Sequence, residues 1–537
     1  MNWITIKECR RRLAGEEGVI SRDWGGRIHI ALIYPNSYSL GMSNLGFQAI
    51  YGLCNSYDQV VCERVFWEGH EPVSLESQRP LGDFDIIAFS FSYEHDYFNS
   101  TSLLKSSGIP VFASERGDSH PLIIAGGAAV TANPEPLASI IDCFAIGEGE
   151  AIIPSILPVL LDNIESPRDR LLQRLGDVPG IYAPATGQST VVRRPMTDIE
   201  NTPTHSVVLT DETELGDMYL MEIARGCARG CRFCLAGYQF RPMRYRSVES
   251  LLEQARKGMQ YRKRVGLVSA AISDHPDISD LVKGLRRMGA EISVSSMRIK
   301  PLSETLLKAL AESGTKTVTL APEAGSVKLR KLIGKGISDD DIFSAMDRVS
   351  RLGFKQVKLY FMFGLPGETD DDIMEITSMV MRAKDIIERH RGGTQLTLNM
   401  SPFVPKAGTP FQWMPMAEES TLKSRLGLVN REVRNRGVGV KSESIEWSIV
   451  QGILSRGDSR LGSVIAGMER LSLAKWRKGL EGAGIDPGLI HQELSLDDPL
   501  PWSILDSGTP VERLQAELKL ATGSRFRDEE ITDRDGQ

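Results

Sequence analysis

The sequence predicts an α/β protein with three parts: an N-terminal doubly wound, Rossmann-type domain, a partial (βα)6 TIM-like barrel and a helical C-terminal domain. Three observations carry this prediction. Apolar runs alternate with helical patterns in residues 27–165, helices end at glycines in residues 217–415, and four prolines interrupt residues 401–415. Continuous apolar runs separated by helices indicate parallel strands that are buried on both faces. A chain of 537 residues is also long enough for about three to four domains.

The first domain is expected to span residues 27–165, after an N-terminal segment of residues 1–26. An amphipathic stretch near residues 44–56 is expected to form a helix. Gly126-Gly127 follows one apolar run, and Gly147-Glu148-Gly149-Glu150 follows the next. Such loops lie at the carboxyl ends of strands, where doubly wound sheets bind ligands. The predicted strands are residues 27–34, 85–91, 121–125 and 140–146.

The barrel is expected over residues 217–415, after a connection of residues 166–216 that is rich in Thr, Pro and acidic side chains. Ser247 is expected to cap its first helix. Each of the next three predicted helices is followed by a glycine, as a left-handed C-cap requires. The predicted strands are residues 217–224, 265–270, 291–295, 315–320, 356–363 and 395–400, and the glycines are Gly289, Gly314 and Gly353. Six strands with intervening helices fit a partial barrel, whose chemistry lies at the carboxyl ends of its strands.

The C-terminal region, residues 416–522, is expected to be mainly helical. Ile445, Ile449 and Ile453 follow one another at intervals of four residues, which is typical of one helix face that packs against a core or caps a substrate. The tail, residues 523–537, is dense in charged side chains and is expected to be disordered.

Composition narrows the classes of partner. The net charge of −7 argues against general binding to a nucleic acid backbone, although an RNA substrate held by a local basic patch is compatible with it. Six arginines in residues 225–246 could face an anionic substrate or surround a negatively charged metal cluster. No apolar run is long enough to span a membrane, and residues 1–12 lack a signal peptide's apolar region. A cytoplasmic protein is expected.

Cys227, Cys231 and Cys234 are the most informative residues, because three thiolates within eight positions can bind one metal centre. A 4Fe-4S cluster is usually held by four cysteines, so three would leave one iron open to another ligand. A structural zinc site would require a fourth Cys or His, and the nearest histidines, His205 and His275, do not belong to a pair. Inert thiols are a third interpretation. Seven cysteines without a secretory signal argue against a disulfide framework.

The C-x3-C-x2-C spacing, with the aromatic Phe233 before the last cysteine, resembles the signature of the radical S-adenosylmethionine (SAM) superfamily. The resemblance implies that the open iron chelates SAM and that an electron from the cluster splits its sulfonium to a 5'-deoxyadenosyl radical, which abstracts hydrogen. It also implies an external electron donor such as flavodoxin or ferredoxin. No catalytic side chain can be assigned.

Two later segments resemble SAM-contacting elements of the same superfamily. Residues 321–326 are similar to its Gly-x-Glu-x-Gly-Ser element, and residues 364–369 to its Gly-x-Pro-Gly-Glu-Thr loop. Glu323 is expected to bind SAM, the alternative being a structural ion pair with Arg298 or Arg330. The segment 269–274 departs from the family's Gly-Gly-Glu. The SAM-binding residues expected from the resemblance are Glu323, Ser326, Gly364, Gly367, Glu368, Ser269 and Asp274.

The first domain resembles the cobalamin-binding-like domain fused in front of many radical SAM enzymes. The resemblance rests on residues 126–135, Asp142 and residues 147–150. The loop of residues 35–41 lacks the D-x-H-x-x-G motif that supplies a lower cobalt ligand, so this domain is expected either to bind cobalamin without that histidine or to keep only the fold. Nearly the whole chain resembles a bacterial group of such fused proteins.

The reaction depends on whether the first domain binds cobalamin or keeps only the fold. Bound cobalamin would imply methylation of an unknown substrate. A non-catalytic iron-sulfur or cobalamin-binding sensor is the alternative function. A peptide, a tRNA base, a lipid and a small metabolite are all compatible substrates.

Overall fold

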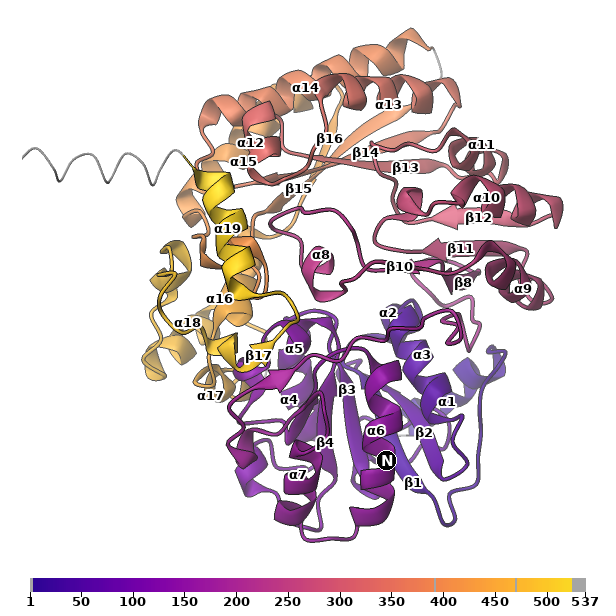
Figure 1. The fold of residues 1–537 in the computed structure, drawn as a ribbon, viewed down its shortest axis with the longest axis vertical. Helices are drawn as coiled ribbons and strands as arrows, with labels where there is room; N and C mark the ends of the chain where they lie inside the picture. The colour runs from indigo at the N-terminus through magenta and orange to yellow at the C-terminus, as the bar shows by residue number, and fades with distance from the viewer. Residues whose placement is uncertain (1–2, 391–392, 469–470, 524–537) are drawn as a thin grey trace, which may run out of the picture.

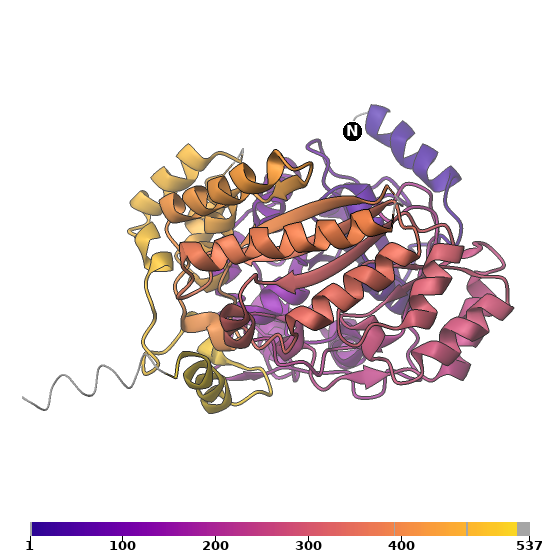
Figure 2. The same ribbon diagram turned by 90° about the horizontal axis from the view of Figure 1, so that it is seen from above.

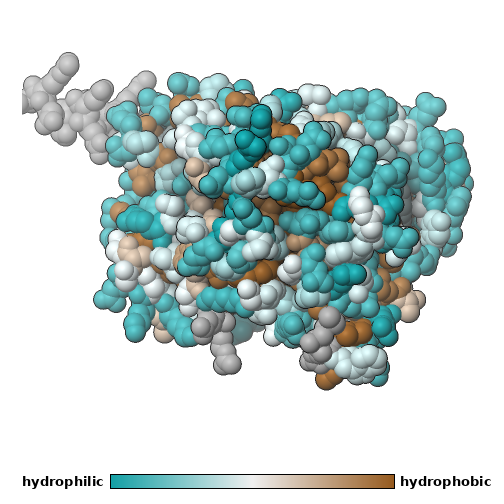
Figure 3. Space-filling model, turned by 90° about the horizontal axis from the view of Figure 1, so that it is seen from below, coloured by the Kyte–Doolittle hydropathy of each residue, from teal (hydrophilic) through white to brown (hydrophobic). Residues whose placement is uncertain are grey.

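A computed structural model describes residues 3–390, 393–468 and 471–523. The N-terminal α/β domain lies below the barrel in Figure 1, and the C-terminal helices lie along one side of both. Apart from Gly523, the tail expected to be disordered lies outside the described residues. No helix in the described ranges is long and apolar enough to cross a membrane. The face seen in Figure 3 is largely hydrophilic, with smaller apolar patches between polar side chains.

The N-terminal sheet has the strand order β2-β1-β3-β4-β5-β6, in which the first five strands are parallel and β6 is antiparallel. This is the flavodoxin-like order, with its topological switch point between β1 and β3. The four predicted strands are present, β2 was not predicted, and β6 is a short strand within the connection of residues 166–216. The strands are β1 (Ile28–Tyr34), β2 (Val60–Phe66), β3 (Ile86–Ser90), β4 (Leu122–Gly126), β5 (Cys143–Ala145) and β6 (Ile181–Tyr182).

Alternate residues of β1 belong to two different cores, as a sheet covered on both faces requires. Ile30 and Leu32 pack in one cluster, whereas Ala31 and Ile33 pack in the other. The boundary expected at residue 165 precedes α7 and β6, so the structure extends this domain beyond it. The helices are α1 (Trp3–Ala14), α2 (Tyr38–Met42), α3 (Leu45–Cys54), α4 (Asp96–Ser106), α5 (Ala128–Ala132), α6 (Gly149–Asn163) and α7 (Arg168–Gly176).

The barrel consists of two parallel sheets, β8-β11-β12 and β13-β14-β15-β16, joined by a bridge between Met297 and Leu320. All six predicted strands are present. A seventh, β16, pairs with β15 and lies beyond the expected barrel boundary at residue 415. The sequence did not reveal it because its four residues carry no apolar run. The strands are β8 (Tyr219–Glu222), β11 (Arg264–Val268), β12 (Glu291–Val294), β13 (Thr317–Glu323), β14 (Gln356–Phe363), β15 (Gln395–Pro402) and β16 (Gly439–Ser442).

Helices cover the outer face of these strands, and Figure 2 shows the long α14 lying across them. The predicted N-cap and the predicted glycine C-caps of these helices are present. Ser247 Oγ accepts a hydrogen bond from Ser250 N, and Gly289, Gly314 and Gly353 adopt positive φ. The helices are α9 (Val248–Gly258), α10 (Ile278–Arg287), α11 (Glu304–Glu312), α12 (Val327–Leu332), α13 (Asp339–Arg351), α14 (Asp370–Arg389) and α15 (Glu419–Arg434).

The C-terminal helices join the two α/β units. Glu94, in the loop after β3, accepts hydrogen bonds from Lys406 Nζ at 2.5 Å and from Gln451 Nε2 at 2.9 Å. Ile445 and Ile453 are buried, so this isoleucine face serves packing. The elements are α16 (Ile445–Arg456), α17 (Leu461–Ala466), α18 (Leu473–Gly482) and α19 (Val511–Thr522), with β7 (Val191–Val192) paired to β17 (Leu505–Asp506).

Candidate metal centre and cofactor cavity

The cysteine loop, residues 226–235, connects β9 (Ala224–Arg225) to α8 (Ala236–Gln239) at the carboxyl end of β8. Gly226 has a φ of +85°, and a Cβ atom there would lie 2.1 Å from Phe240 O, so only glycine fits. Arg232 N donates to Ile333 O at 2.9 Å, which fastens the loop to the end of α12. The loop therefore lies at the catalytic end of the barrel, as predicted.

The three thiols lie near one another and near two cations. Cys227 and Cys231 are buried, and Arg298 Nη1 lies 3.9 Å from Cys227 Sγ. Burial raises the pKa of Cys231, while Lys335 and Arg298 lower it. Burial also raises the pKa of Cys234 to about 11. Metal binding requires thiolates, and neighbouring cations stabilise them.

In the described ranges, no three His, Cys, Asp or Glu side chains are grouped closely enough to hold a single metal ion. Zinc requires its ligands around one point, at sulfur distances of about 2.3 Å. The thiolates of a 4Fe-4S cluster bind separate irons and can stand further apart. Three thiols on one tight loop with two cations beside them are a donor set that fits such a cluster.

The six arginines of residues 225–246 are engaged in structural contacts. Arg225, Arg244 and Arg246 form ion pairs with Glu148, Glu150 and Glu222. The other three bind side chains or carbonyls around the cysteine loop: Arg229 pairs with Asp274, Arg232 with Glu517, and Arg241 donates to Gly237 O. Arg225 and Arg244 also have a role that the sequence did not predict. Through Glu148 and Glu150, these two arginines hold the N-terminal domain against the barrel.

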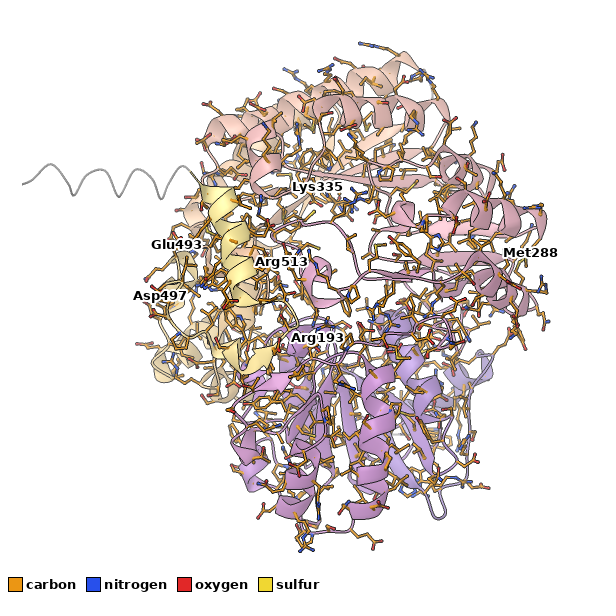
Figure 4. The ribbon with its side chains drawn as sticks, viewed as in Figure 1. Arg193, Met288, Lys335, Glu493, Asp497 and Arg513 are labelled. Carbon is orange, nitrogen blue, oxygen red and sulfur yellow. The ribbon has the colours of Figure 1, made fainter. Side chains whose placement is uncertain are left out.

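Glu323 ends β13 in a strained conformation. Its φ of +70° lies in the left-handed region, which non-glycine residues seldom adopt. Lys335 Nζ donates to Glu323 Oε1 at 2.9 Å, and Glu323 also raises the pKa of Cys231. The carboxylate therefore lies beside the cysteine loop. The expected alternative partners, Arg298 and Arg330, are bound elsewhere, because Arg298 lies by Asp274 and Arg330 pairs with Asp339. Figure 4 shows Lys335 between the barrel strands and α8.

Asp274 and Ser269 both lie at the carboxyl end of β11, but their surroundings differ. Arg229, within the cysteine loop, donates to both oxygens of Asp274, at 2.9 and 2.8 Å. Ser269 lines the large cavity described below. Ser326 caps α12, where its Oγ accepts from Leu329 N at 3.1 Å. Asp274 and Ser326 thus have clear structural partners.

The loop of residues 364–369 is closed by its own glutamate. Glu368 Oε2 accepts hydrogen bonds from Gly364 N at 2.6 Å and from Arg425 Nη1 at 2.9 Å. Gly364 and Gly367 both have positive φ, as the tight loop requires. Burial raises the pKa of Glu368 to about 7, although Gly364 N and Arg425 act in the opposite direction. The buried Glu368 carboxylate therefore stabilises the conformation of this loop.

A cavity of about 490 Å³ separates the N-terminal sheet from the cysteine loop. Its floor is apolar and runs between the sheet and helices α3 and α6. Its mouth is formed by the two glycine loops of the N-terminal domain and by Gly226 of the cysteine loop. The lining includes Leu32, Ala49, Ile156, Gly126, Gly147 and Gln239. A largely apolar ligand would fit here, with one end beside Gly226, the residue before Cys227.

Gln239 is a functional candidate that sequence analysis missed. Its side chain is buried and lines the cavity, and its Nε2 donates to Ala128 O at 2.8 Å across the domain boundary. Its Oε1 has no hydrogen-bond partner among the described residues. A buried acceptor without a partner costs free energy unless a ligand supplies a donor. No local sequence signal marks Gln239, because its partners come from another domain.

These features define a class of protein: a parallel-barrel enzyme with a three-cysteine loop at its catalytic end, faced by a second α/β domain across a large cavity. Comparison with known proteins agrees. One family model, described as the radical SAM superfamily, matches residues 221–380, and another, described as the N-terminal part of radical SAM proteins, matches residues 46–184.

An uncharacterized protein of Methanocaldococcus jannaschii, MJ0966, is 31% identical over 444 residues, which are 81% of this chain and 90% of that protein. An uncharacterized methyltransferase of Pyrococcus horikoshii, PH0819, is 25% identical over 282 residues, 49% of this chain and 58% of that protein. The cobalamin-dependent SAM radical enzyme OxsB with aqua-cobalamin has a similar fold, with a TM-score of 0.51, 14% identity and coverage of 94% and 81% of the two chains. The chain belongs to the radical SAM superfamily.

Proposed function

We propose that this radical SAM enzyme binds a 4Fe-4S cluster through Cys227, Cys231 and Cys234, and that it methylates a carbon atom of its substrate with the help of cobalamin. The observation that carries the proposal is the cavity between the glycine loops and the cysteine loop. It brings the cobalamin-binding-like domain and the candidate metal loop to one space, which methyl transfer between the two cofactors would require.

The cluster would supply the electron that splits SAM to a 5'-deoxyadenosyl radical, and cobalamin would supply a methyl carrier. The protein's own residues hold and orient these groups. Arg298 and Lys335 offset negative charge at the cysteine loop. Glu323 would accept hydrogen bonds from the SAM ammonium group, which its position beside Lys335 and the cysteine loop supports, and the loop of residues 364–369 would shape the adjoining wall. An external electron donor of the flavodoxin or ferredoxin type would deliver the electron.

The cavity suits cobalamin without a protein ligand to cobalt. No histidine lines it in the described part of the chain, in keeping with the loop of residues 35–41, which lacks the D-x-H-x-x-G motif. Its apolar floor could bury the hydrocarbon portions of a large cofactor. The free acceptor of Gln239 matches the amide N–H groups on the periphery of a corrin ring.

The iron-sulfur half of the proposal is tested by anaerobic reconstitution with iron and sulfide. We expect about four irons per chain and reductive cleavage of SAM to 5'-deoxyadenosine. The variant with all three cysteines changed to alanine should lose both, whereas Cys62→Ala, a buried cysteine of β2, should retain both. Iron that is bound without SAM cleavage would favour the sensor alternative, and retention of both properties by the triple variant would reject the cluster site.

Cobalamin binding is tested by filling the cavity. Ala49→Phe places a ring in the cavity and should abolish the cobalamin spectrum of the reconstituted protein while iron content is unchanged. Gln239→Leu should weaken binding about tenfold, the value of one buried hydrogen bond. Ala516→Phe, on an exposed face of α19, is the matched control. If wild-type protein does not bind cobalamin after reconstitution, the cobalamin half of the proposal is rejected, whereas the proposed SAM cleavage is not.

A further inference from the structure

The inner face of the β13–β16 sheet carries polar and basic side chains. Burial alternates strictly along β14, where Leu359 and Phe361 join the core that the outer helices cover. Side chains of alternate residues in a strand point to opposite faces, so Lys358 and Tyr360 face the barrel interior. The same alternation places Thr319 of β13 and Asn399 of β15 on that inner face.

Strand register brings these residues into rows. Tyr360 pairs with Asn399, and Asn399 pairs with Lys441 of β16. Parallel strands lie about 4.8 Å apart, so the three side chains form one row across neighbouring strands. Lys358 lies in the next inward row, in register with Thr319 and Thr397. The unpredicted edge strand β16 therefore adds a second lysine, which is exposed to solvent, to the row of Tyr360 and Asn399.

The two lysines and the Asn399 acceptor in these rows have no partners among the residues that the structure describes. Lys358 and Lys441 form no ion pair with any residue that the structure describes, whereas nearby Lys335 is paired with Glu323. Asn399 Oδ1 is buried and lacks a hydrogen bond within the described ranges. Tyr360 is 37% exposed, so solvent reaches this part of the interior. Two uncompensated cations beside an unsatisfied acceptor are the complement of an anion that also carries a hydrogen-bond donor.

We propose that the substrate carries a carboxylate or phosphate group, which binds Lys358 and Lys441, and a neighbouring hydroxyl or amino group, which donates to Asn399. This inference rests on the proposed function, because it treats the barrel interior as the place of reaction. Tyr360 lies three residues below the end of β14, or about 10 Å at 3.3 Å per residue. The anionic end would lie at that depth, and the reacting carbon would extend towards Glu323 and the cysteine loop.

The test measures binding of simple probes by calorimetry. Inorganic phosphate and succinate are the anionic probes, and erythritol is the neutral one. We expect wild-type protein to bind at least one anion, and the Lys358→Met/Lys441→Met double variant to bind it at least tenfold more weakly. Lys308→Met, an exposed lysine of α11, should bind like wild type. Tighter binding of phosphate would assign a phosphorylated substrate, and tighter binding of succinate a carboxylate.

A second measurement avoids variants altogether. The probe that binds should protect Lys358 and Lys441 of wild-type protein from reductive methylation, read by mass spectrometry, and should leave Lys308 unprotected. Failure of both anions to bind, equal binding by the double variant, or equal binding of erythritol would overturn the proposal. SAM cleavage measured without any substrate reports on the proposed function separately, because it depends on the cysteine loop and not on these lysines.

Discussion

Arg225 Nη1 lies 2.8 Å from Glu148 Oε2, and this ion pair joins the residue before the cysteine loop to the glycine loop after β5. Arg244 binds the same carboxylate from the other side, with its Nη2 at 2.8 Å from Glu148 Oε1. Glu148 is only 5% exposed. One buried carboxylate therefore holds together the two walls of the cavity, and its arginines cannot serve a substrate at the same time.

Glu148→Ala should destabilise the protein by about 3–5 kcal/mol, because it leaves Arg244 buried without a carboxylate partner and removes one of the three carboxylates that pair with Arg225. Denaturant unfolding measures this change. Glu253→Ala removes the exposed ion pair with Lys257 and should leave stability nearly unchanged, because water screens exposed charges. Equal, small effects of the two substitutions would show that the Glu148 contacts do not hold the domains together.

Glu323→Gly should raise the free energy of unfolding by about 1 kcal/mol, because glycine adopts the left-handed conformation without the cost that a side chain incurs. The same substitution should weaken SAM binding, measured by equilibrium dialysis, since it removes the carboxylate beside the cysteine loop. Glu323→Gln keeps the backbone conformation and should weaken SAM binding without the gain in stability. Undiminished SAM affinity in both variants would reject Glu323 as a ligand.

Glu368 should make stability depend on pH between about 4.5 and 7. Burial raises its pKa from 4.5 to about 7, so the folded protein holds this proton more tightly than the unfolded chain does. Its contribution to stability is present below about pH 4.5 and is lost as the pH rises through 7. The melting temperature of the wild type, relative to that of Glu368→Gln, should therefore fall as the pH rises over this range. A difference independent of pH would contradict the raised pKa.

Gly127→Ala should cost about 3 kcal/mol, because its Cβ would lie 2.4 Å from Phe91 O at a φ of +108°. Gly187→Ala is the control, since its φ is +68° but no atom lies within 4 Å of the new Cβ. It should cost about 1–2 kcal/mol from the backbone alone. Thermal unfolding measures both losses of stability. Similar losses would indicate that glycine is needed at position 127 only for its backbone conformation, and not for the close approach to Phe91.

The order of strands and helices could be predicted well because local patterns encode it. Gly289, Gly314 and Gly353 each mark a helix end, and the apolar runs of β1, β3, β4 and β14 mark buried strands. Strand β16 could not be predicted, since Gly439-Val-Lys-Ser442 is polar and gains its place only by pairing with β15. The connection of residues 166–216 also concealed α7 and β6, which are short elements held by the first domain's sheet.

The sequence by itself determined the three-cysteine loop, the class of barrel that presents it and the family to which the chain belongs. Those features depend on spacing and on local backbone requirements, which neighbouring residues set. Only the tertiary structure decided that the arginines of residues 225–246 are engaged in contacts, that Lys335 is the partner of Glu323, that Gln239 lines a cavity and that Lys441 is exposed. These facts depend on contacts between residues far apart in the chain, and no local pattern records which distant partner satisfies a buried charge or amide.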